Sequence, residues 1–152
     1  MANTEKDLMV SSSAFNDGGN IPTKYTCEGE AINPPLKIDN IPQGAKSLAI
    51  IVEDPDAPNG TFDHWIAWNI PPESDIRENR NVGVSGMNSA QKTGYYPPCP
   101  PSGIHRYYFY LFALDNDLDL KEGANKQQLK DAMKEHVMAI GVLMGRYEKG
   151  KK

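Results

Sequence analysis

The sequence has no hydrophobic run long enough to cross a membrane. No stretch approaches the roughly 20 apolar residues that a spanning helix needs. The first ten residues, MANTEKDLMV, carry acidic side chains where a secretory signal needs a basic stretch followed by an apolar one. These absences predict a soluble cytoplasmic protein with no membrane span.

An excess of basic residues is also missing. The chain has 16 lysines and arginines against 20 aspartates and glutamates, for a net charge of −4. Proteins that coat nucleic acid or anionic membranes rely on positive charge. The charge therefore predicts no nucleic-acid partner, and any bound anion must be held by a local site.

Cysteine is scarce, with only Cys27 and Cys99 in the chain. Two isolated cysteines in a reducing compartment usually remain thiols, and intracellular disulfides are rare outside hyperthermophiles. We therefore expect free thiols, and a bridge between the two is the less favoured alternative.

The composition that remains is globular. The 152 residues are 39% hydrophobic and 24% charged, which predicts a single domain over residues 1–152. All twelve prolines lie in the first 101 residues, and eight of them fall in clusters at residues 33–35, 54–58 and 97–101. Because proline interrupts helices, this part of the chain is expected to form short strands joined by loops.

Three segments have strong strand character. Residues 48–53 (LAIIVE), 64–70 (HWIAWNI) and 105–114 (HRYYFYLFAL) are rich in β-branched or aromatic side chains. The first and the last are apolar on both faces, which suits strands inside a sandwich. Weaker candidates are residues 8–15, 36–38 and 140–144.

One segment, residues 126–137, has a helical pattern. Asn125 can cap its start while Gln128 reaches back, the arrangement of a capping box. Five residues recur at helical spacing along one face: Leu129, Ala132, Met133, His136 and Val137. We expect this helix to pack on the sheet.

Polar side chains stand at the ends of the strong strands. Asp54 closes the first strand and His64 opens the second, so an antiparallel hairpin makes them neighbours. His105 opens the third strand, and two-residue alternation puts Tyr107 on the same face. If the third strand runs in the same direction as the second, all four side chains meet at one edge.

Such a group has the chemistry of an anion site. Two imidazoles can donate hydrogen bonds or carry charge, a carboxylate can fix the tautomer of one of them, and a phenol adds a neutral donor. Charge-assisted hydrogen bonds contribute ~1.5–3 kcal/mol each, so a few together can hold a phosphate against water. The residues thus predict a small-anion pocket.

A metal site is the first alternative. Asp54, Asp56 and Asp63 with the two histidines could ligate a divalent ion. No closely spaced histidine pair supports this, and aspartates in proline-rich loops commonly cap turns. We therefore predict no metal and no cofactor.

An enzyme is the second alternative. Catalysis needs a nucleophile or an activated water within reach of a base. The same aspartates and histidines could run acid–base chemistry on a phosphoester. We expect a binding protein that is not an enzyme, and an uncharacterised phosphoester hydrolase acting through this pocket is the alternative.

Two segments carry a specific resemblance. Residues 54–58 (DPDAP) with His64-Trp65, and residues 97–107 (PPCPPSGIHRY), resemble the two signature segments of the phosphatidylethanolamine-binding protein family. Flanking pieces such as 25–29 (YTCEG) and 145–147 (GRY) fit its bacterial and archaeal Raf-kinase-inhibitor-like branch. The resemblance covers nearly the whole chain.

The resemblance implies a mainly β fold, a Greek-key β-sandwich with a large antiparallel sheet, a smaller sheet and one or two short helices. It also implies a pocket for phosphate or phosphorylated head groups such as phosphoethanolamine. The positions that match the pocket, with Phe62 and Trp65 as apolar walls, are Asp54, Asp56, Pro58, Phe62, His64, Trp65, His105 and Tyr107.

The resemblance further implies protein partners, and the sequence departs from the family at one position. Members of the family are credited with inhibiting protein kinases and serine proteases, and some prokaryotic relatives form homodimers. Pro97 stands where the family usually has a glycine whose backbone N–H donates to the anion, and proline lacks that donor. We therefore expect either weaker phosphate affinity or a shifted loop.

Overall fold

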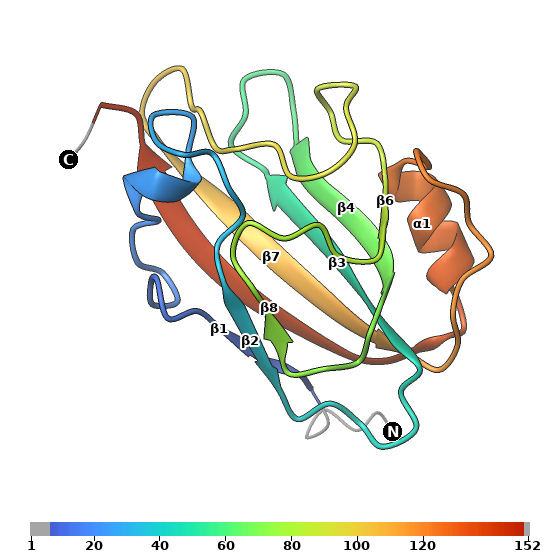
Figure 1. The fold of residues 1–152 in the computed structure, drawn as a ribbon. Helices are drawn as coiled ribbons and strands as arrows, with labels where there is room; N and C mark the ends of the chain where they lie inside the picture. The colour runs from blue at the N-terminus through green and yellow to red at the C-terminus, as the bar shows by residue number, and fades with distance from the viewer. Residues whose placement is uncertain (1–6, 151–152) are drawn as a thin grey trace.

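Two antiparallel β-sheets form the framework of the computed structural model, which describes residues 7–150 (Figure 1). The larger sheet has the strand order β6-β4-β3-β7-β8 and the smaller has the order β1-β2-β5. The larger sheet consists of β3 (Ser47–Asp54), β4 (Phe62–Ile70), β6 (Val84–Ser85), β7 (Ile104–Leu114) and β8 (Val137–Glu148). The smaller consists of β1 (Met9–Ser11), β2 (Leu36–Asp39) and β5 (Asp75–Ile76). The expected mainly β architecture of two antiparallel sheets is confirmed.

β3 lies at the centre of the larger sheet and is covered on both faces. One face of β3 and its neighbours packs against the smaller sheet, in a core that includes Ile38, Ile50 and Phe109. The other face packs beneath the helix, in a core that includes Ile51 and Leu129. A strand enclosed on both sides needs apolar residues at successive positions, which explains the run in β3.

The helix α1 (Lys126–Met133) begins as expected and ends earlier. Asn125 accepts the backbone N–H of Gln128, whose side chain accepts the N–H of Asn125, so the predicted capping box is present. Glu135 adopts a φ of 71°, and Val137 then opens β8. The prediction of a helix to residue 137 was therefore wrong at its C-terminal end. No helix within residues 7–150 is long and apolar enough to cross a membrane.

The three strong strands are present and one or two residues longer than expected. The weak strand at residues 140–144 is instead the twelve-residue β8, while the weak strand at 8–15 shrinks to β1. Gly141 in β8 has no side chain to clash with the N-terminal segment: a Cβ there would lie 2.5 Å from the carbonyl oxygen of Leu8. The two-residue strands β5 and β6 and the 3-10 turn η2 (Thr23–Tyr25) are too short to show a periodic pattern.

The two cysteines form a disulfide, so the expectation of free thiols was wrong. The Cys27 and Cys99 Cα atoms lie 5.4 Å apart, although 72 residues separate them in sequence. The segment after η2 runs beside the proline-rich loop, where the backbone N–H of Cys27 donates to the carbonyl of Pro98 at 3.1 Å. The fold creates this proximity, and each cysteine looks isolated in the sequence.

Candidate functional site

The strand directions bring the predicted polar residues together. β3 pairs antiparallel with β4 on one side and with β7 on the other, so β4 and β7 run in the same direction. Both of them begin at the end of the sheet where β3 stops. Asp54 therefore lies between His64 and the pair His105 and Tyr107, as the alternation and hairpin argument predicted.

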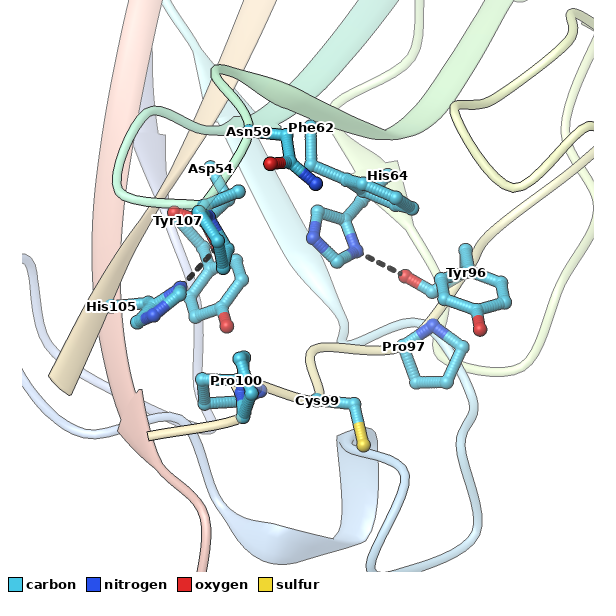
Figure 2. Close-up of a pocket in the computed structure, with 13 residues that line it drawn as sticks. Asp54, Asn59, Phe62, His64, Tyr96, Pro97, Cys99, Pro100, His105 and Tyr107 are labelled. Atoms are coloured by element: carbon cyan, nitrogen blue, oxygen red, sulfur yellow. Dashed lines mark hydrogen bonds and ion pairs between the residues drawn. The ribbon is translucent and has the colours of Figure 1, made fainter. Parts of the chain in front are cut away.

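These four residues line a cavity of about 390 Å³ at this end of the sheet (Figure 2). The inner part is polar, and apolar residues, mostly prolines and aromatics, surround the rest. Its full lining is Asp54, Ala57, Pro58, Asn59, Phe62, His64, Tyr96, Pro97, Cys99, Pro100, Pro101, His105 and Tyr107.

A buried carboxylate–imidazole pair forms one side of the pocket. Oδ2 of Asp54 lies 2.6 Å from Nδ1 of His105, and the side chains of both are less than a tenth exposed. The other carboxylate oxygen of Asp54 accepts the backbone N–H of Asp56 at 2.8 Å. Because the carboxylate accepts from Nδ1, the orientation and tautomer of the ring are fixed, as predicted.

A β-bulge sets the position of His64. Val52 pairs with Trp65 and Glu53 pairs with Asp63, which leaves His64 as the extra residue on β4. Bulges often re-aim a side chain next to a functional site. The bulge was invisible in the sequence, where simple alternation was assumed.

His64 is held through the backbone of Tyr96. Nδ1 of His64 lies 2.8 Å from the carbonyl oxygen of Tyr96, whose N–H donates back to the carbonyl of His64. Burial lowers the pKa of His64 below its ordinary value of 6.5; the Tyr96 carbonyl and the charge of Asp54 oppose this lowering. The ring is therefore biased toward its neutral form.

Tyr107 lies between the two imidazoles. Its ring meets that of His64 edge-on at 5.2 Å between centroids and stacks on that of His105 at 6.4 Å. The hydroxyl is buried and has no hydrogen-bond partner within the described part of the chain. Burial raises the pKa of Tyr107, so the phenol stays protonated and can donate.

The apolar walls come from both sides of the pocket. The ring of Phe62 packs on His64 at 4.8 Å and on Tyr96 at 5.7 Å between centroids. Pro58 and Pro97 lie in the lining, and Pro97 contributes no N–H. Tyr96 was not predicted as a pocket residue. Its position directly before the proline cluster is the one feature of the sequence that could have indicated it.

Asp56, expected in the pocket, is absent from its lining. Its carboxylate instead faces Arg106: one oxygen accepts from the backbone N–H and from Nε at 2.9 Å, and the other accepts from Nη2 at 2.7 Å. Hydrogen bonding to Arg106 lowers the pKa of Asp56 to about 2. Asp56 thus ties the loop after β3 to the start of β7.

Trp65, expected as a second apolar wall, is also absent from the lining. It is 2% exposed and lies in the core between the two sheets, edge-on to Tyr95 at 5.5 Å. The bulge leaves Trp65 and His64 on the same face, with Trp65 one step deeper along the strand. Its role is packing.

The metal alternative finds no support in the geometry. Asp63 points to the other face of the sheet, where Nζ of Lys126 lies 2.7 Å from it and 3.1 Å from Glu53. Within residues 7–150, no three His, Cys, Asp or Glu side chains are grouped as a metal site. Cys99 lines the pocket with its sulfur bonded to Cys27.

The fold and the site together define a two-sheet β protein with a small cavity at one end of its larger sheet, polar in its inner part and apolar around it. A family model described as phosphatidylethanolamine-binding protein matches residues 11–148. The chain belongs to the phosphatidylethanolamine-binding protein family, as the signature segments indicated.

Relatives of known sequence and structure agree with this. A UPF0098 protein of Methanothermobacter thermautotrophicus is 48% identical over 151 residues, covering 94% of this chain and all of the relative. A UPF0098 protein of Chlamydia muridarum is 48% identical, covering 93% and 99%.

Two solved structures share the fold. The crystal structure of CT736 from Chlamydia trachomatis, described as a putative phosphatidylethanolamine-binding protein homolog, has a TM-score of 0.91 and 46% identity, covering 95% of this chain and 99% of that one. E. coli YbcL, described as a new member of the mammalian family, has a TM-score of 0.84 and 25% identity, covering 93% and 98%.

Proposed function

We propose that the pocket binds a small oxyanion, either phosphate or a phosphorylated head group such as phosphoethanolamine. The observation that carries this proposal is the unpartnered hydroxyl of Tyr107, buried between two imidazoles. A buried donor without a partner costs roughly 1–3 kcal/mol. A ligand oxygen that accepts from the hydroxyl recovers that energy.

The remainder of the lining supports a ligand with a short organic arm. Phe62, Tyr96 and the prolines place apolar surface around the polar inner part. Prolines also hold the loops stiff, so little conformational entropy is lost when a ligand enters. An anion carried on a short alkyl chain suits this arrangement.

Calorimetric titration of phosphate and phosphoethanolamine tests the proposal. Tyr107→Phe removes one hydroxyl and should weaken binding about tenfold to a hundredfold, because a hydrogen bond to a charged group contributes roughly 1.5–3 kcal/mol. His136→Gln, which changes the histidine outside the pocket, is the matched control. Failure of the unmodified protein to bind either ligand, or equal affinity in Tyr107→Phe, would contradict the proposal.

We infer that the pocket binds without turnover. The sulfur of Cys99 is held in the disulfide, and no serine or threonine belongs to the lining. One observation favours the hydrolase alternative: the Asp54–His105 pair has the arrangement of a base oriented by a carboxylate. Phosphoester turnover that disappears in His105→Ala would show that the pocket hydrolyses its ligand and does not only bind it.

We further propose that the biological output is inhibition of a protein kinase or a serine protease. Family membership is what supports this proposal. A panel of kinases and proteases that retains full activity at saturating protein would contradict it.

We also propose that the protein is cytoplasmic and that it forms a homodimer. Fractionation of the cells that make the protein tests its location. Sedimentation velocity over a range of concentrations tests whether it is a dimer.

A further inference from the structure

Both pocket histidines are held through the same ring nitrogen. Nδ1 of His64 contacts the carbonyl oxygen of Tyr96, and Nδ1 of His105 contacts the carboxylate of Asp54. A carbonyl or carboxylate oxygen can only accept, so in each ring Nδ1 must carry the hydrogen. The contacts thus determine the tautomer of both rings.

A neutral imidazole has one N–H, so the other nitrogen of each ring is then a bare acceptor. Figure 2 shows the second nitrogen of His64 turned away from Tyr96 and toward the side of the pocket where His105 and Tyr107 lie. When both rings are neutral, two residues of the pocket lining therefore carry a bare acceptor nitrogen, Nε2 of His64 and Nε2 of His105. An oxyanion oxygen placed against either nitrogen would be repelled, because both atoms present a lone pair and neither carries a hydrogen.

Few other donors reach the inner pocket. Four of its lining residues are prolines, which have no N–H: Pro58, Pro97, Pro100 and Pro101. The hydroxyl of Tyr107 donates without needing an added proton. The Asn59 amide and the Tyr96 phenol are the other side-chain donors in the lining, and Asn59 is exposed.

We infer that an oxyanion enters this pocket together with protons, one for each histidine Nε2 that it contacts. This rests on the proposed anion binding and specifies its ligand state: for a phosphorylated head group, the protonated monoanion is favoured over the dianion, which carries no proton. Each proton sits between Nε2 and a ligand oxygen, whether it arrives on the ligand or from solvent. Affinity for a phosphorylated head group therefore rises as the pH falls.

The charges around the rings are consistent with this coupling. The charge of Asp54 favours a charged imidazole at His64, while His105 disfavours it. The remaining acids near the rings are already paired, Asp56 with Arg106 and Asp63 with Lys126. The phenols that face the rings are those of Tyr96, Tyr107 and Tyr147, the last opposite His105 on β8.

The tautomers are tested without any ligand. Nitrogen-15 NMR of the imidazoles near pH 8 distinguishes Nδ1–H from Nε2–H directly. We expect the Nδ1–H form in both pocket histidines, and His136→Gln assigns the third signal. An Nε2–H form in either pocket ring would overturn the inference, whatever the protein binds.

The coupling is tested by titrating phosphoethanolamine in pairs of buffers that differ in ionisation enthalpy. At about pH 8, where its phosphate group is a dianion that carries no proton, we expect uptake of about one to two protons per ligand bound. Affinity should fall about tenfold per pH unit for each proton taken up. Measurable binding with no proton uptake would overturn the inference and leave the proposed function intact.

His64→Gln supplies a permanent N–H near the position of Nε2 and should lower the uptake by about one proton. His136→Gln should match the unmodified protein. Unchanged uptake in folded His64→Gln would exclude a proton at that ring. If neither phosphate nor phosphoethanolamine binds at any pH between about 5 and 8, the proposed function is removed, and the NMR result still decides the tautomers.

Discussion

At the scale of single residues, Asp54 organises the pocket. Its two carboxylate oxygens accept from Nδ1 of His105 and from the backbone N–H of Asp56. It thus orients one ring of the pocket lining and fixes the turn that carries Pro58.

Asp54→Ala should lower the free energy of unfolding by about 3 kcal/mol, because it leaves Nδ1 of His105 and the backbone N–H of Asp56 without their acceptor. The control is Asp115→Ala, which breaks the exposed pair with His136 (2.8 Å) and should cost less than about 1 kcal/mol. Urea unfolding measures both variants. Equal losses would show that burial does not distinguish the two pairs.

The lowered pKa of His64 predicts a pH dependence of stability. In the unfolded chain the ring binds a proton near pH 6.5, whereas burial opposes protonation in the folded protein. The unfolded state therefore gains protons first, so stability is complete above pH 6.5 and is lost as the pH falls through the lower folded value.

Urea unfolding between about pH 8 and 5 measures this loss, and His64→Gln should show a shallower decline. Added phosphate should reduce the loss in the unmodified protein, since it binds the protonated rings. Parallel profiles for the two proteins would assign the pH dependence to other groups.

At the scale of elements, the pocket depends on a loop that is tied to the sheet at few points. The Tyr96 backbone bonds to His64, and the Cys27–Cys99 bridge joins the proline-rich segment to the residues after η2. A single covalent link thus holds one wall of the pocket in place.

Replacing both cysteines by serine should destabilise the protein by about 4 kcal/mol in the chain-entropy model, because the bridge spans 72 residues. Phosphate affinity should also fall, since the wall loses its anchor. Thermal melting and calorimetry measure the two effects, with the unmodified protein in a dithiol reductant as a second test. Unchanged affinity after confirmed reduction would show that the prolines alone hold the wall.

Lys126 fastens the start of α1 to the sheet on the face opposite the pocket. Lys126→Met leaves the carboxylates of Glu53 and Asp63 without their shared cation and should cost roughly 1.5–3 kcal/mol. Exposed Lys130→Met is the control, expected to change stability by less than about 0.5 kcal/mol. Phosphate binding should be unaffected in both, and a weakened affinity in Lys126→Met would show that the two faces are coupled.

At the scale of the whole molecule, two core layers share one central sheet. β3 contributes residues to both cores. Loss of packing in one core therefore exposes a strand on which the other core also depends. The single domain expected over residues 1–152 should therefore unfold in one cooperative transition. Calorimetry checks this through equal calorimetric and van't Hoff enthalpies, and two separate transitions would contradict it.

Local patterns were enough to predict much of this protein. The three long strands, the capping box and the family segments each depend on residues close together in the chain, where propensity and spacing act directly. The same holds for Asp54, His64, His105 and Tyr107, which stand at strand ends whatever the details of the fold.

Only the tertiary structure decided the rest. The Cys27–Cys99 bridge, the pairing of Asp56 with Arg106 and the packing of Trp65 in the core all join segments that are distant in sequence or depend on one bulge in a strand register. A one-residue change of register moves a side chain to the other face of a sheet, and no local pattern records it. The sequence by itself thus determined that Asp54, His64, His105 and Tyr107 reach the pocket, and the pairing of distant strands determined how these side chains are oriented and which residues join them.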